Sequence, residues 1–258
     1  MNVFISSSSY DTKTERLYKS RQYLELIPSN VFKLTDLKLL HLDENKIDKI
    51  PAAILSLDKL ISLDLSHNNI ACIPMELYML TNMEQLYLSH NNIKQVSSKL
   101  SSLTQLRVLD LSHNHITHLS NKMSGLTKLT MLDISCNNLH VFPEECCQMV
   151  MLEGLFINKN KITVIPKKIS YLTKLKRFYC SSNKITYIPY GLHKLKKLYD
   201  LTMHNNFIQE IIKTHLPDVQ YITLHGNPLR ELTLYNNSNN ITQLMEYFNS
   251  PNYILQQG

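Results

Sequence analysis

A 23-residue period runs through most of this chain and limits the folds that it can adopt. The first apolar residue of each unit recurs at that spacing, at Leu37, Leu60, Met83, Leu106, Leu129, Leu152, Leu175 and Leu198, and a step of 21 residues leads to Val219. A fixed period in this range indicates a solenoid built from small structural repeats. Because no single unit can bury its own apolar face, neighbouring units must stack to form a continuous core.

The unit that begins at Leu60 shows how one repeat is expected to fold. Leu63 and Leu65 are two residues apart, which predicts a short strand with Asp64 on its opposite face. A buried amide without partners costs about 1–3 kcal/mol, so an asparagine within this pattern must bond the backbone of the turn. We therefore expect a ladder formed by Asn45, Asn68, Asn91, Asn114, Asn137, Asn160, Asn183, Asn206 and Asn227.

The pattern L-x-x-L-x-L-x-x-N-x-L-x-x-I-P-x-x-I-x-x-L resembles the leucine-rich repeat. It occurs as LISLDLSHNNIACIPMELYML from Leu60 and as LEGLFINKNKITVIPKKISYL from Leu152. The 23-residue form with I-P resembles the intracellular class of the Ras-scaffold proteins, the Scribble and Erbin group and the plant Ras-group-related proteins. The resemblance implies an α/β solenoid, with a curved parallel β-sheet on the concave face and irregular turns and short helices on the convex face. It is specific for the fold and much less so for function.

The repeat boundaries divide the chain into four segments. We expect a flexible N-terminal segment (1–15), an N-terminal capping half-repeat (16–36), nine leucine-rich repeats (37–232) and a C-terminal cap (233–258). Apolar residues at helical spacing predict a short helix near 241–248, which would cover the end of the core or, alternatively, dock on a partner. Proline begins the convex segment in most units, and serine replaces it at Ser97 and Ser120, where we expect a looser path.

The cysteines indicate a reducing compartment. Their number is odd, and none lies before Cys72 or after Cys180, so disulfide caps of the kind that close extracellular repeat proteins are not expected. Cys146 and Cys180 occupy apolar columns, which predicts free buried thiols. The first residues, MNVFISSSSYDTK, lack the basic start and apolar stretch of a signal peptide. We therefore expect a cytoplasmic protein.

Two patterns suggest chemistry, but neither predicts an enzyme. Ser-His-Asn occurs three times, from Ser66, Ser89 and Ser112, which repeat duplication explains and a single catalytic arrangement does not. One column contains Glu44, His67, His90, His113 and Cys136. Such a row could bind zinc or copper, or respond to pH, but its exposed turn position favours neither. With no glycine-rich phosphate loop either, we predict no catalytic site, metal or cofactor.

The predicted binding surface is the concave face of the sheet. The residue between the two inward leucines of each strand would face solvent, and aromatic residues and arginine dominate binding energy at interfaces. The stripe, with Arg177 beside it, contains His41, Asp64, Tyr87, Asp110, Asp133, Phe156 and Tyr179. We predict a protein–protein interaction scaffold that uses this face, and we expect Asp110→Ala to change stability little. The resemblance implies small-GTPase or related signalling.

The alternative surface is a lysine-rich half. Eleven basic and no acidic residues lie between Gly154 and Tyr199, so the rest of the chain contains 16 basic residues and all 21 acidic ones. This half could bind an acidic protein, an anionic membrane or nucleic acid. Nucleic acid is the least favoured because few aromatic residues accompany the lysines for base stacking. The residues concerned are Lys167, Lys168, Lys174, Lys176, Lys194, Lys196 and Lys197.

Overall fold

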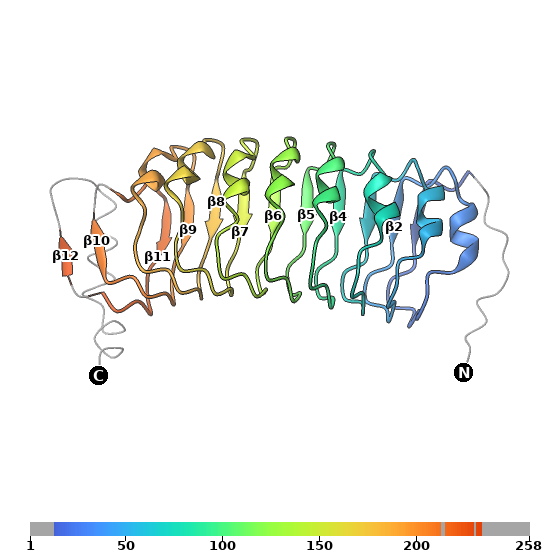
Figure 1. Ribbon diagram of the computed structural model, residues 1–258, viewed down its shortest axis with the longest axis horizontal. Helices are drawn as coiled ribbons and strands as arrows, with labels where there is room; N and C mark the ends of the chain where they lie inside the picture. Colours follow the sequence, from blue (N-terminus) through green and yellow to red (C-terminus); the bar gives the residue numbers. More distant parts are fainter. Residues whose placement is uncertain (1–12, 213–214, 230, 234–258) are drawn as a thin grey trace.

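Ten three-residue strands form one open parallel sheet along the length of the molecule (Figure 1). The computed structural model describes residues 13–212, 215–229 and 231–233. The strands follow chain order, and each pairs with its equivalent in the next unit. They are β1 (Arg16–Tyr18), β2 (Leu39–His41), β3 (Ser62–Asp64), β4 (Gln85–Tyr87), β5 (Val108–Asp110), β6 (Met131–Asp133), β7 (Gly154–Phe156), β8 (Arg177–Tyr179), β9 (Asp200–Thr202) and β11 (Tyr221–Thr223).

Short 3-10 helices cover the opposite side of the core (Figure 1). Proline stands directly before most of them and fixes φ where its missing N–H does no harm. Ser97 and Ser120 replace it before η4 and η5, and each hydroxyl accepts the backbone N–H two residues later at 3.2 Å. The looser path expected there is wrong, because this bond caps a helix of the usual five residues.

The bounds of these helices repeat at nearly the same place in every unit. The described residues include η1 (Ser29–Lys33), η2 (Ala52–Ser56), η3 (Met75–Met79), η4 (Ser98–Ser102), η5 (Asn121–Gly125), η6 (Glu144–Gln148), η7 (Lys167–Tyr171) and η8 (Tyr190–Lys194). At the C-terminal end, β10 (Glu210–Ile212) and β12 (Glu231–Thr233) form a separate parallel pair. The predicted solenoid, with a parallel sheet on one side and short helices on the other, is confirmed.

The core lies between the sheet and the 3-10 helices and continues from unit to unit. Leu60, Leu63, Leu65 and Ile70 are fully buried, and their equivalents extend this cluster along the chain. Burial of one such leucine contributes about 1.5–3 kcal/mol relative to its exposure, which explains why apolar residues recur in these columns. The predicted free buried thiols at Cys146 and Cys180 are confirmed.

Two predicted segments lie wholly or mostly outside the described residues. They are the helix near 241–248 and the N-terminal segment 1–15, of which the structure describes only residues 13–15. Residues 16–36 supply β1 and η1, and β1 pairs with β2 in the register of the later units. Within the described part of the chain, no helix has the length and apolar character needed to cross a bilayer.

Candidate functional site

The asparagine ladder fixes the turn that follows each strand. Asn68 Oδ1 accepts the Ile47 N–H at 2.9 Å, and Asn68 Nδ2 donates to the carbonyls of Leu42 and Leu65 at 3.0 and 3.1 Å. Equivalent bonds recur from Asn45 to Asn227. Each amide therefore ties its own turn to the preceding unit, and the predicted ladder is confirmed.

The residue before each ladder asparagine has a left-handed backbone. Its φ is 54° at His67, 52° at His90 and 51° at His113. The three imidazoles stack on the exposed edge, with ring centroids 4.0 and 3.8 Å apart and planes 12° and 13° from parallel. Partial burial and the neighbouring imidazoles lower the pKa of His90. The sequence showed the column but not the left-handed backbone or the stack.

The concave stripe is continuous across the sheet. Strand register pairs His41 with Asp64, Asp64 with Tyr87 and Tyr87 with Asp110, and the pairing continues to Asp133, Phe156 and Tyr179. Except for Phe156, these side chains are half-buried, and each stands between two fully buried apolar residues. The structure therefore brings the predicted residues together on one face. Tyr87 and Tyr179, with Arg177 beside them, are its half-exposed residues of the types that dominate interfaces.

Phe156 does not face solvent as expected, because its neighbours cover it. Its side chain is only 9% exposed. The ring folds over Gly154, where a Cβ atom would come within 3.1 Å of it. Tyr179 packs against the ring at 4.9 Å between centroids, and the Arg177 guanidinium lies 5.6 Å from its centre. The sequence offered one signal of this burial. Gly154 stands in a column that holds larger residues, such as Gln85 and Arg177, in other units.

Three concave aspartates shape the ends of their strands. Asp64, Asp110 and Asp133 each accept the backbone N–H of the serine two residues later at 2.9 Å. Burial raises the pKa of Asp133. The expectation that Asp110→Ala changes stability little therefore overlooks the hydrogen bond from the Ser112 N–H. These carboxylates are tied to the fold and are less free to meet a partner than predicted.

Tyr179 links two strands on the same face. Its hydroxyl donates to Asp200 at 2.5 Å, and this bond, helped by burial, raises the pKa of Tyr179 to about 12. The phenol is therefore neutral and oriented at physiological pH. Together with Phe156 and Arg177 it forms a packed group across β7, β8 and β9.

The lysine-rich half is less uniform than the sequence indicated. Lys168 pairs with Glu144 at 2.8 Å, and Lys176 pairs with Glu153 at 2.7 Å. Both acids lie before Gly154 in the chain, but the repeat places them beside lysines 23 or 24 residues later. Because these pairs are exposed, each contributes little to stability. Lys167 is the first residue of η7, and Lys194 is the last residue of η8. Both therefore lie on the helical side of the molecule, away from the concave face.

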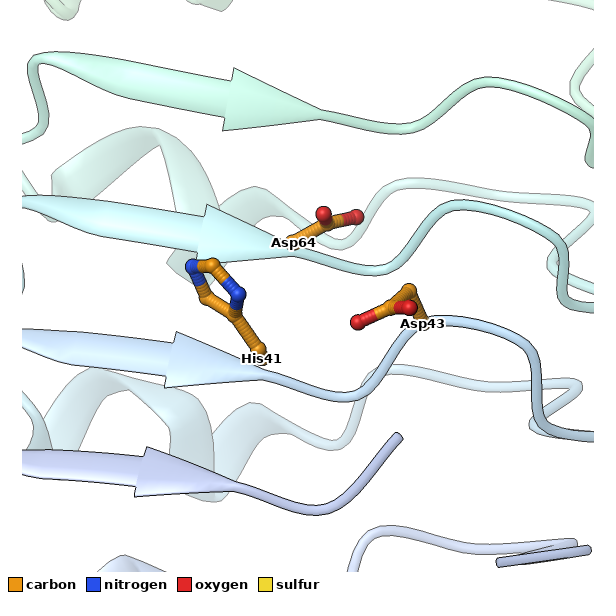
Figure 2. A group of neighbouring side chains, drawn as sticks. All are labelled: His41, Asp43 and Asp64. Atoms are coloured by element: carbon orange, nitrogen blue, oxygen red, sulfur yellow. The ribbon is translucent and has the colours of Figure 1, made fainter. Parts of the chain in front are cut away.

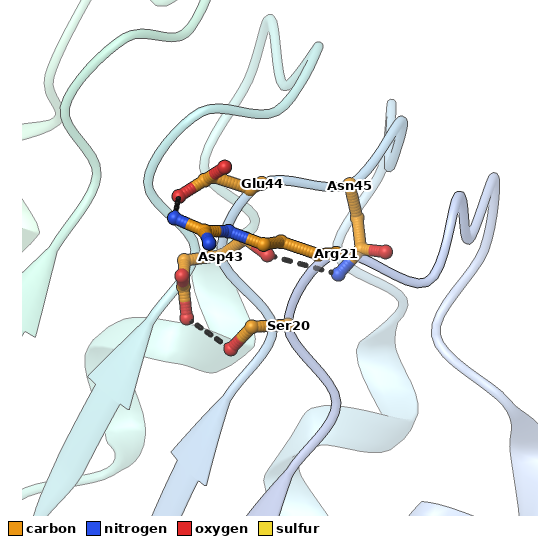
Figure 3. Close-up of polar contacts among 5 residues, drawn as sticks. All are labelled: Ser20, Arg21, Asp43, Glu44 and Asn45. Carbon is orange, nitrogen blue, oxygen red and sulfur yellow. Dashed lines mark hydrogen bonds and ion pairs between the residues drawn. The ribbon is translucent and has the colours of Figure 1, made fainter.

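One further polar group lies at the N-terminal end of the concave face. Ligand atoms of His41, Asp43 and Asp64 lie within 4.8 Å of one another (Figure 2). The Ser20 hydroxyl donates to Asp43 at 2.5 Å, and Arg21 pairs with Glu44 beside it (Figure 3). This group went unrecognised because the three residues belong to two units. The available signal was an aspartate in a column that holds serine in several later units.

Comparisons with known proteins agree with this geometry. A family model described as a leucine-rich repeat region matches residues 17–140 and 94–218. A leucine-rich repeat protein of Leptospira interrogans is 23% identical, with a TM-score of 0.70 over 92% of this chain and 71% of that one. An internalin of Listeria monocytogenes is also 23% identical, with a TM-score of 0.67 over 86% and 70%.

A plant receptor gives a further structural match. The ectodomain of the membrane receptor kinase GASSHO1/SCHENGEN3 from Arabidopsis thaliana was solved in complex with CASPARIAN STRIP INTEGRITY FACTOR 2. It is 24% identical, with a TM-score of 0.77, and the match covers 85% of this chain but only 28% of the receptor chain. At these identities the likeness concerns the fold. No curated protein sequence matches the chain.

Proposed function

The chain belongs to the leucine-rich repeat family, and from that premise we propose that it is a non-enzymatic scaffold that binds a protein partner on its concave face. The observation that carries the proposal is the stripe of side chains that strand pairing aligns across β2 to β8, all of them half-exposed except Phe156. Short strands at fixed spacing hold these side chains in place, so a partner would meet a surface that is already ordered. A preorganised surface loses less conformational entropy on binding.

The strongest contacts are expected toward the C-terminal half of this face. Arg177 and Tyr179 are half-buried, and their neighbours restrict their rotation. Tyr87 adds a third half-exposed anchor nearer the middle of the sheet. Phe156 supports Arg177 and Tyr179 from below. One matched structure is the GASSHO1/SCHENGEN3 ectodomain in complex with CASPARIAN STRIP INTEGRITY FACTOR 2, and another is the crystal structure of PEPR1-AtPEP1. These two matches support a protein or peptide as the ligand class.

We further propose that the protein is cytoplasmic and that its partner acts in small-GTPase or related signalling. Support comes from the I-P form of the repeat and from the free thiols at Cys146 and Cys180. Cell fractionation tests the location. A panel of purified small GTPases, each loaded with GDP or a GTP analogue, tests the pathway. Secretion of the protein would contradict the proposed location, and binding to none of the panel would contradict the proposed partner class.

The binding surface is tested by capturing partners with three baits. One is wild type, one carries Tyr87→Ala and Arg177→Ala, and one carries Tyr171→Ala and Lys167→Ala on the helical side. The second and third baits lose similar side chains from opposite faces, and urea melts establish that each folds. We expect partners to be lost from the concave variant and retained by the helical-side variant. Partners that are retained by the concave variant and lost from the helical-side variant would overturn the proposal.

A second candidate function uses the lysine-rich half. Lys167 and Lys194 are exposed and form no ion pair with any residue of the described part of the chain, so both are available to an acidic protein or an anionic membrane. Attraction of this kind weakens as salt screens it. Binding that disappears between about 50 and 200 mM salt, and that Lys167→Ala with Lys194→Ala abolishes, would favour this function over the concave face.

A further inference from the structure

We propose that His41, Asp43 and Asp64 form an open site for a divalent transition-metal ion of the Zn²⁺ type at the N-terminal end of the concave face. One imidazole and two carboxylates converge there, with a ligand atom of each within 4.8 Å of the other two (Figure 2). Histidine nitrogen and aspartate oxygen are both established zinc ligands. An imidazole also favours a transition metal over Ca²⁺ or Mg²⁺, which prefer oxygen ligands alone.

The sheet itself brings these residues together. Parallel pairing of β2 with β3 places His41 directly beside Asp64. Asp43 lies two residues after His41, so the alternation of an extended chain directs it to the same face. All three side chains are partly exposed, which leaves the group open to an ion from solution.

Repeat duplication does not explain this combination. The positions equivalent to His41, Asp43 and Asp64 hold Asp64, Ser66 and Tyr87 one unit later, and Tyr87, Ser89 and Asp110 after that. Within the described units, three ligating side chains occupy these positions only once. The decisive change is aspartate at position 43, where the next four units have serine. In the next unit, the backbone N–H of Ser66 at the equivalent position donates to Asp64.

The two carboxylates are oriented but remain without a cation of their own. The Ser20 hydroxyl holds one oxygen of Asp43 at 2.5 Å, and the Ser66 N–H holds one oxygen of Asp64 at 2.9 Å, so each carboxylate keeps a second oxygen. Arg21 is the nearby cation, and its guanidinium pairs with Glu44 (Figure 3). Among the described residues, neither Asp43 nor Asp64 forms an ion pair with lysine or arginine. A divalent ion would balance both charges.

The spacing suits a site that closes on the ion. Ligand atoms in a tetrahedral zinc site lie roughly 3.4 Å apart, because each is about 2.1 Å from the metal. Because the ligand atoms here all lie within 4.8 Å of one another, reaching that spacing requires each atom to shift by at most about 1 Å, which is within the range of side-chain rotation. Three protein ligands leave the fourth position open toward the concave face.

The test is calorimetric titration of the full chain with Zn²⁺ alone, at pH 7.5 in a buffer that does not chelate metal. Asp43→Ser restores the residue of the following units, so it removes a ligand at little risk to the fold. His41→Asn removes the imidazole. A control with His67→Asn, His90→Asn and His113→Asn removes the exposed histidine stack, which is the competing place for zinc. Circular dichroism and urea melts establish that each variant is folded.

We expect one saturable site in wild type and in the stack control. Both Asp43→Ser and His41→Asn should weaken it by about tenfold or more, as expected for loss of one of three ligands. The proposal is overturned if wild type shows no saturable binding up to about 100 μM Zn²⁺, if Asp43→Ser or His41→Asn binds as wild type does, or if only the stack control loses binding. None of these outcomes depends on the protein partner, so the metal site and the proposed function are tested separately.

Discussion

Asn114 and His113 are consecutive in the chain, yet the fold places opposite demands on them. Asn114 is 4% exposed, and its amide bonds the backbone of Ile93, Leu88, Leu111 and Ser112. His113 is exposed, and the fold requires of it only a left-handed φ of 51°. The position before the ladder therefore varies among Glu44, His67, His90, His113, Cys136, Lys159, Ser182, Asn205 and Gly226, whereas the ladder position stays asparagine.

The difference separates the part of the repeat that makes the fold from the part that is free to acquire function. Ladder residues satisfy backbone groups that no other side chain of the unit reaches. Side chains at the neighbouring column and on the concave stripe meet solvent and one another. Substitutions in the ladder should therefore lower stability most. Substitutions outside it should lower stability only where they disturb the left-handed backbone or a hydrogen bond at a strand end. Four predictions follow this division, in order of decreasing effect.

Asn114→Ala should lower the free energy of unfolding by about 2–4 kcal/mol, because it leaves several buried backbone groups without partners. Asn92→Ala is the matched control, since Asn92 is exposed and makes one long side-chain bond of 3.4 Å to Asn69. Urea melts of both variants measure the difference. Equal loss in the two would contradict the distinction between ladder and surface asparagines.

His90→Val should destabilise the chain by about 1–2 kcal/mol, because a β-branched residue is poorly accommodated at a φ of 52°. His90→Gly should be close to neutral, since glycine adopts this conformation without steric cost. Thermal melts of the pair test the point, because both remove the same imidazole. If valine and glycine gave the same midpoint, backbone conformation would not be what the fold requires at this position.

Asp110→Ala should cost about 0.5–1.5 kcal/mol, because it removes the acceptor of the Ser112 N–H at 2.9 Å. Gln85→Ala is the control on the adjacent strand, because Gln85 is exposed on the same face. Urea midpoints compare the two variants. A loss no larger than that of the control would show that water replaces the aspartate at this strand end.

The smallest expected effect is a pH dependence at the histidine stack. Because the folded state lowers the pKa of His90 below its ordinary value of 6.5, the unfolded chain binds the proton more readily. Stability from this group is complete above pH 6.5 and declines as pH falls through the lower pKa of the folded state. His67 and His113 oppose protonation of His90, and Asp110 favours it.

The measurement is the urea midpoint at pH 7.5 and at pH 5.5, for wild type and for His90→Asn. Wild type should lose more stability between the two values than the variant does. A larger loss in His90→Asn would mean that the stack is favoured by protonation, contrary to the direction of the His90 shift.

The sequence allowed prediction of the features that recur as the same residue type in each unit. Leucine columns, the ladder from Asn45 to Asn227 and the concave stripe follow from a constant period, because each unit meets the same neighbours. Features that depend on one unit differing from the next were not predicted. The burial of Phe156 depends on Gly154, and the group around His41 depends on Asp43.

Two other features were hidden for different physical reasons. Lys176 meets Glu153 because residues one period apart are adjacent in space, and a count along the chain separates them. The left-handed φ at His90 leaves no mark in the sequence, because histidine, glutamate, cysteine and lysine all occupy that column. Glycine, the residue type most often found with a left-handed backbone, occupies the column at Gly226, whose φ is 67°.

The most direct test of the account is the dissociation constant of the partner captured by wild type, measured for the two double variants. Tyr87→Ala with Arg177→Ala should weaken binding about 30-fold or more, since each anchor contributes on the order of 1–2 kcal/mol at an interface. Tyr171→Ala with Lys167→Ala should leave the constant within about twofold of wild type. Loss of affinity in the helical-side variant, with the concave variant unchanged, would contradict the claim that the concave face binds the partner.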